Sequence, residues 1–132
     1  MDTNKMTSVL KDRKVILSTL WIFAMFNYIY ADVFSVFFDP TAQQEALTFA
    51  GFAVVFAVLM ETAIAMVLLS RVLNYAANRW ANIIVAVLHT ASVAWSLFGD
   101  TPKPFYVLFA TVEIACTLFI IWYAWTWRNP EG

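Results

Sequence analysis

The chain has 132 residues, of which 62% are hydrophobic and 13% are charged, and its formal net charge is -1. Charged residues make up about a quarter of an ordinary soluble domain, so the composition excludes that class, and the length leaves room for one compact unit. The net charge and the lack of a basic patch with interleaved aromatic residues exclude a nucleic-acid-binding protein. Cys116 is the single cysteine, which excludes an intramolecular disulfide and a thiolate metal site.

Four apolar segments are long enough to cross a bilayer as helices, because about 20 residues span its hydrocarbon core. We expect these helices at residues 15–37, 46–70, 80–98 and 105–127. They form one transmembrane domain over residues 15–128, with a polar N-terminal arm at 1–14 and a tail at 129–132. The predicted fold class is therefore all-α, an up-down four-helix transmembrane bundle. The first segment is too long for the apolar region of a signal peptide, so we interpret it as an uncleaved span.

The breaks between these segments carry clear local signals. Asp39-Pro40 ends the first helix, because proline cannot continue the hydrogen-bond ladder and disfavours helix at the residue before it. The run Gly99 to Pro104 separates the last two helices. Between the second and third helices we expect a turn over residues 71–79, with Asn74 and Asn78 as capping residues.

Basic residues predict the orientation in the membrane. Seven of the eight lysines and arginines fall in the N-terminal arm, in the 71–79 turn or directly after the last helix at Arg128, and only Lys103 falls on the other side. Cytoplasmic loops carry the excess of Lys and Arg, so both termini are predicted to be cytoplasmic. Tryptophans near this side are expected to form an interfacial belt: Trp21, Trp80, Trp122, Trp125 and Trp127.

Ionisable side chains well inside the helices define the candidate site: Asp32, Glu61, His89 and Glu113. Each costs about 2.5–3.5 kcal/mol near the bilayer centre on insertion scales, so we expect them to face inward and to pair or stay neutral. Glu61 lies on one stripe with Ala53, Ala57 and Ala65, and such stripes of small residues let helices approach closely. The sequence predicts one interior cavity lined by all four ionisable side chains.

Roles within this cavity follow from residue type. We expect Glu61 or Glu113 to donate a proton and His89 to act as its partner, which makes these three the candidate catalytic residues. Polar residues on the same helix faces are the candidate ligand-binding residues: Asn27, Tyr28, Asp32, Asn82, Ser92, Ser96 and Thr117. The alternative is purely structural, with the acids, His89 and Asn27 serving as interhelical hydrogen bonds. No Glu-x-x-His or His-x-x-x-His pair occurs, so no metal or cofactor is predicted.

Three functions fit this pattern. The first is a pocket for a small lipophilic or amphipathic ligand drawn from membrane lipid, with or without acid–base chemistry, so enzymatic activity stays open. The second is proton-coupled transport of a small molecule by a homodimer, since membrane-embedded acids mark proton relays. The third is an auxiliary or structural subunit whose small, polar faces bind other helices. We favour the first.

Several segments resemble a known family: residues 61–73, residues 78–84, Glu113-Ile114-Ala115-Cys116 and Ile121-Trp122-Tyr123-Ala124-Trp125. Together they are similar to small four-span bacterial membrane proteins known only as a domain of unknown function, over nearly the whole chain after the N-terminal arm. An acid in the second helix, followed by an apolar run and a basic turn, resembles the DoxX-like group more distantly. These resemblances imply a bacterial inner membrane protein and imply no reaction.

Overall fold

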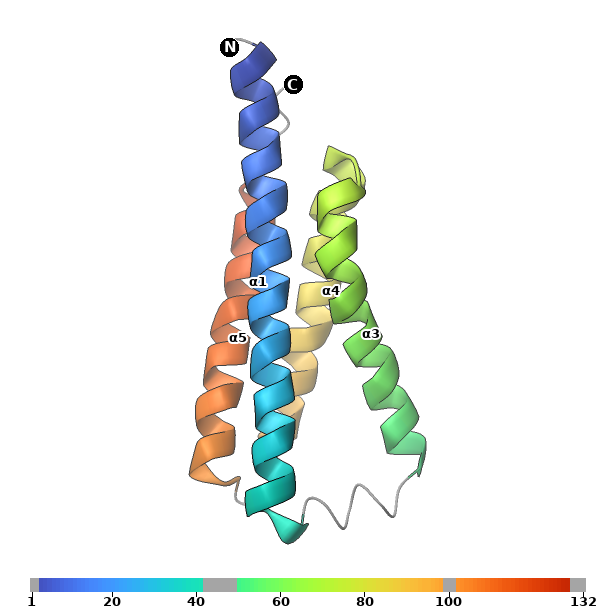
Figure 1. The fold of residues 1–132 in the computed structure, drawn as a ribbon, viewed down its shortest axis with the longest axis vertical. Coiled ribbons are helices and arrows are strands. Elements are labelled where there is room, and N and C mark those ends of the chain that lie inside the picture. The colour runs from blue at the N-terminus through green and yellow to red at the C-terminus, as the bar shows by residue number, and fades with distance from the viewer. Residues whose placement is uncertain (1–2, 42–49, 99–101, 129–132) are drawn as a thin grey trace.

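The computed structural model describes residues 3–41, 50–98 and 102–128, and its main elements are four long helices (Figure 1). They are α1 (Thr3–Phe38), α3 (Ala50–Val72), α4 (Tyr75–Ser96) and α5 (Pro104–Trp125). The described residues contain no strand. The all-α class predicted from the sequence is therefore confirmed.

The helix ends follow the local signals. α1 ends at Phe38, directly before Asp39-Pro40. Asn74 caps the N-terminus of α4, because its side-chain oxygen accepts a hydrogen bond from the Ala77 N–H at 3.0 Å. Asn78 serves the other side of the same turn, since its Nδ2 donates to the Ser70 carbonyl at the end of α3 at 2.7 Å. The turn itself consists of only two residues, 73 and 74, and is shorter than predicted.

α1 begins at Thr3, so the expected boundary near residue 15 is wrong. The first 39 residues contain neither Gly nor Pro, and nothing in them stops a helix. A tertiary contact also holds this end of α1. The Arg13 guanidinium donates from Nη1 to the Tyr123 carbonyl at 2.7 Å and lies 4.3 Å from the centre of the Tyr123 ring. Because Tyr123 belongs to the last turn of α5, Arg13 ties this part of α1 to the end of α5.

The helices do not pack evenly. α1 lies between α3 and α5 and packs against both, and α4 packs against α5, whereas α3 and α4 touch much less. Figure 1 shows the reason: α3 approaches its neighbours near the α3–α4 turn and diverges from them toward Ala50. The start of α1 and the end of α5 lie at the same end of the molecule as that turn.

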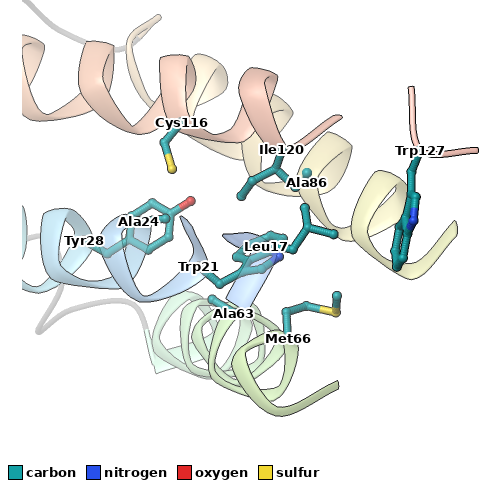
Figure 2. Close-up of a cluster of buried hydrophobic side chains, with 10 residues drawn as sticks. All are labelled: Leu17, Trp21, Ala24, Tyr28, Ala63, Met66, Ala86, Cys116, Ile120 and Trp127. Atoms are coloured by element: carbon teal, nitrogen blue, oxygen red, sulfur yellow. The ribbon is translucent and has the colours of Figure 1, made fainter. Parts of the chain in front are cut away.

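The hydrophobic core lies mainly along one face of α1 (Figure 2). Its α1 residues recur at spacings of three and four, as expected for a helix that buries one stripe. Around them, α3 contributes Ala63 and Met66, and Trp127 closes the end. The cluster consists of Leu17, Trp21, Ala24, Tyr28, Ala63, Met66, Ala86, Cys116, Ile120 and Trp127.

The outer surface is strongly apolar. Within the described residues, three segments are long and apolar enough to cross a membrane: Asp12–Phe38, Ala53–Val72 and Pro104–Trp125. This is the surface of a membrane protein. α4 is not among the three, because polar residues such as Asn78, Asn82 and His89 lower its hydropathy, and these three side chains are buried.

Two of the tryptophans predicted for the interfacial belt lie elsewhere. Trp21 is fully buried, and Trp127 is 2% exposed. Trp80, Trp122 and Trp125 are about half exposed, as a belt requires. Trp21 can be buried because its indole N–H donates to a buried acceptor, the Asn82 Oδ1, at 2.8 Å.

Candidate functional site

A cavity of about 450 Å3 lies in the half of the molecule where α3 diverges, and all four described helices line it. α3 supplies an apolar wall that includes Val55, Phe56, Leu59 and Met60. The other helices supply the polar side chains: Tyr28, Asp32, His89, Ser92, Ser96, Tyr106 and Glu113. The cavity therefore has an apolar wall on α3, whereas its opposite wall combines these polar side chains with apolar residues such as Val93 and Trp95.

His89 is held at both ring nitrogens. Its Nδ1 lies 3.0 Å from the Tyr28 hydroxyl, and its Nε2 lies 2.9 Å from the Thr62 hydroxyl. Thr62 gives its own proton to the Leu59 carbonyl at 2.6 Å, so its oxygen accepts from Nε2–H. In the neutral imidazole, Nδ1 then accepts the Tyr28 proton. The network links α1, α3 and α4 and selects one tautomer.

Glu113 is the least satisfied side chain of the cavity. It is 5% exposed, and its Oε1 has no hydrogen-bond partner among the described residues. Asp32 lies close enough for the two carboxyl groups to interact electrostatically, although Asp32 is itself exposed. A buried carboxyl oxygen without a hydrogen-bond partner is costly, so this position differs from the paired polar groups around it.

Hydroxyl groups elsewhere in the cavity already have acceptors. Tyr106 donates to the Ser96 Oγ at 2.7 Å, and Ser96 donates to the Val93 carbonyl at 2.6 Å. Ser92 donates to the Leu88 carbonyl of its own helix at 2.8 Å. Each hydroxyl proton is thus engaged away from Glu113.

The structure brings together six of the predicted site residues and separates the others. Those that line the cavity are Tyr28, Asp32, His89, Ser92, Ser96 and Glu113. Asn27 lies outside, because its side chain donates to the Phe23 carbonyl within α1. Thr117 lies behind the cavity, where it accepts a hydrogen bond from Thr90 at 2.7 Å and joins α4 to α5.

The placement predicted for Glu61 is wrong. Glu61 lies on the exposed face of α3, together with Ala53, Ala57 and Ala65. The buried stripe is instead the one that contains Thr62, Met66 and Ser70. Thr62 binds His89 and Ser70 binds Asn82, and these two hydrogen bonds set the rotation of α3 about its axis.

Asn82 belongs to a second group, which we call the inner polar cluster: Ser18, Trp21, Ser70, Asn78 and Asn82. All five residues are fully buried. The Asn82 Oδ1 accepts from Trp21 Nε1 at 2.8 Å and from Ser70 Oγ at 3.3 Å, and its Nδ2 donates to the Asn78 Oδ1 at 2.7 Å. Ser18 donates to the Val67 carbonyl at 2.8 Å. The cluster joins α1, α3 and α4 near the α3–α4 turn. It adjoins the cavity through Trp21, whose ring meets the His89 ring edge-on at 5.4 Å between centroids.

Sequence reasoning missed Thr62 and Tyr106 as site residues. Tyr106 shares a helix face with Ala110, Glu113 and Thr117, which was the available signal. For Thr62 the signal was weaker. It follows Glu61 directly and lies four residues before Met66 and eight before Ser70, on the same helix face as those two residues. Within the described residues, no three His, Cys, Asp or Glu side chains are grouped to hold a metal ion.

Comparison with known proteins gives one match. A family of unknown function, DUF6326, matches residues 5–132. No curated protein and no solved structure matches the chain. The resemblance to a family of unknown function is confirmed, whereas the more distant resemblance to the DoxX-like group stays a prediction. The chain belongs to the family of unknown function DUF6326.

Proposed function

We propose that this protein binds a small lipophilic or amphipathic molecule in the cavity between α3 and the other helices. One observation carries the proposal: a buried carboxyl oxygen of Glu113 has no partner among the described residues, at the wall of a cavity of about 450 Å3. Ligand pockets typically measure about 300–1,000 Å3 and combine apolar walls with a few polar groups. A ligand would supply what the empty site lacks.

The shape of the cavity fits a molecule with two unlike ends. The polar head faces Glu113 and Asp32, and the apolar part lies along Leu59 and Met60 of α3. Because α3 and α4 pack loosely against each other, the ligand enters between them from the surrounding lipid.

Binding is favoured over acid–base chemistry at His89. Both ring nitrogens are engaged by Tyr28 and Thr62, so neither is free to exchange a proton with a ligand. The buried positions of Asn82 and His89 also favour a ligand pocket over an auxiliary subunit, which would turn such residues outward.

The proposal includes a membrane topology. The four described helices form an up-down four-helix transmembrane bundle in which α4 is the fourth span. α4 and α5 both have 22 residues, about 33 Å at 1.5 Å per residue. The exposed face of α4 is apolar, with Ile84, Val87 and Leu88. The distribution of Lys and Arg supports cytoplasmic termini. The resemblance to small bacterial membrane proteins supports a location in the inner membrane of a bacterium.

Photolabelling tests the pocket. The probe is a ten-carbon alcohol carrying a diazirine, added to the protein in phosphatidylcholine nanodiscs, with excess 1-decanol as competitor. We expect displaceable labelling of residues 55–60 and 91–96. Ala91→Phe fills the cavity and reduces this labelling at least fivefold, whereas Ala65→Phe, the same change on the exposed face of α3, leaves it unchanged. Labelling that decanol does not displace, or that both variants reduce equally, would refute the pocket.

A further inference from the structure

We infer that the ligand of this cavity carries a protonated amino group, which Glu113 and Asp32 bind together. This inference rests on the proposed function and names its ligand class. Three separate features of the site lead to it: the charges of the lining residues, the missing donor at Glu113, and the apolar wall of α3.

The charges of the lining point to a cation. Two carboxyl groups, Asp32 and Glu113, line the cavity and interact electrostatically, and no Lys or Arg is among the lining residues that the structure describes. A carboxyl group removed from water either takes up a proton and stays neutral or keeps its charge beside an opposite charge. A positively charged ligand supplies that charge, whereas a carboxylate ligand adds a third negative group to the site.

The hydrogen bonds point to a donor. Glu113 Oε1 is buried and accepts no hydrogen bond among the described residues. The hydroxyl protons of Ser92, Ser96 and Tyr106 go to other acceptors, and the Tyr28 hydroxyl serves His89. None of these hydroxyl groups donates to Glu113, and a donor carried by the ligand would complete the site. A primary ammonium group provides both the donor and the charge, and hydrogen bonds between charged groups are the stronger ones.

The apolar wall of α3 indicates the chemistry of the rest of the ligand. Val55, Phe56 and Leu59 offer apolar surface to a hydrocarbon chain or ring that extends from the ammonium group. The ligand class is thus an amphipathic primary amine.

Displacement of the photoprobe by four ten-carbon compounds tests the inference. They are decylamine, decyltrimethylammonium, 1-decanol and decanoate, compared at pH 7 in phosphatidylcholine nanodiscs. We expect decylamine to displace the probe at a concentration at least tenfold lower than 1-decanol. Decyltrimethylammonium, which has the charge without an N–H, falls between them, and decanoate is the weakest.

A matched pair of variants tests whether Glu113 causes the preference for decylamine over 1-decanol. Glu113→Gln is expected to abolish the tenfold preference for decylamine over 1-decanol, because the carboxylate is lost while the size is kept. Glu61→Gln makes the same change on the exposed face of α3 and leaves the preference intact. Asp32→Asn, at the more exposed position, is expected to reduce the preference about threefold. It provides a second test of the same preference if Glu113→Gln fails to fold.

The outcomes separate this inference from the proposed function. Equal displacement by decylamine and 1-decanol in the unchanged protein refutes the amine and leaves the pocket standing. Tighter binding of decanoate also refutes it. A preference that survives both Glu113→Gln and Asp32→Asn shows that the amine is bound elsewhere. Absence of any displaceable labelling refutes the pocket itself.

Discussion

The inner polar cluster and the cavity both contain buried polar side chains, but they differ in how completely these side chains are hydrogen-bonded. In the inner polar cluster, the Asn82 side chain makes hydrogen bonds to Trp21, Ser70 and Asn78, and all of these groups are fully buried. In the cavity, Glu113 is also buried, yet its Oε1 has no partner among the described residues. The Asn82 side chain of the inner polar cluster is hydrogen-bonded, whereas a carboxyl oxygen at the wall of the cavity is not.

Under the proposed function, this difference distinguishes polar groups that join helices from a polar group that binds a ligand. A buried network in which every member is paired joins helices and specifies their arrangement. A buried polar group that lacks a partner destabilises the empty protein, and such positions persist at sites that serve binding. Four variants, ordered from the largest expected effect to the smallest, test this division.

Asn82→Leu is expected to have the largest effect. The change leaves the Trp21 N–H and the Asn78 Oδ1 buried without their partner. We expect the free energy of unfolding to fall by about 2 kcal/mol, measured by SDS titration in mixed micelles with circular dichroism. Asn27→Leu is the matched control, because Asn27 bonds only within α1, and an equal loss in both variants would contradict the role of the cluster.

Glu113→Leu is expected to act in the opposite direction. Leucine removes the unpartnered carboxyl group at similar side-chain size, so the free energy of unfolding should rise by about 1 kcal/mol in the same SDS titration. Displacement of the photoprobe by decylamine should weaken at the same time. A fall in stability would mean that Glu113 is a structural residue like Asn82, and the distinction between the two regions would fail.

Tyr28→Phe tests the network that separates the two regions. Loss of the hydroxyl removes the donor to His89 Nδ1, which should lower the free energy of unfolding by about 0.6 kcal/mol. His89 is the only histidine, so its two ring nitrogens are resolved by 15N NMR of protein carrying no histidine tag.

In the unchanged protein we expect the proton on Nε2 and none on Nδ1. In Tyr28→Phe both tautomers should be populated, because Nδ1 has lost the donor that selected the Nε2–H form. Tyr30→Phe, on the exposed face of α1, should leave the spectrum unchanged. A proton on Nδ1 in the unchanged protein would show that the hydrogen bonds run in the reverse direction.

Glu61→Gln is expected to have the smallest effect. Glu61 is exposed on α3, so its surroundings differ little between the folded bundle and the separated helices. The free energy of unfolding should change by less than about 0.5 kcal/mol. A large change in the SDS titration would place Glu61 in a contact that the isolated chain does not form.

The sequence by itself determined the four long apolar helices, where most of them end, and which faces of α4 and α5 are buried, but not the extension of α1 back to Thr3. Asp39-Pro40 ends α1 and Asn74 caps α4, because these signals act over a few residues and need no partner. The buried face of α4 was readable as well, since Asn82 and His89 are polar interruptions in an otherwise apolar helix and have one direction in which to find partners.

Only the tertiary structure decided the rotation of α3 and the true members of the cavity. α3 has small residues on two faces, one containing Glu61 and the other Ala63, so small-residue spacing could not choose between them. The choice depends on Thr62 and Ser70, which bond to residues of α4. Pairings between helices depend on the positions of both partners, and a pattern within one helix records only one of them.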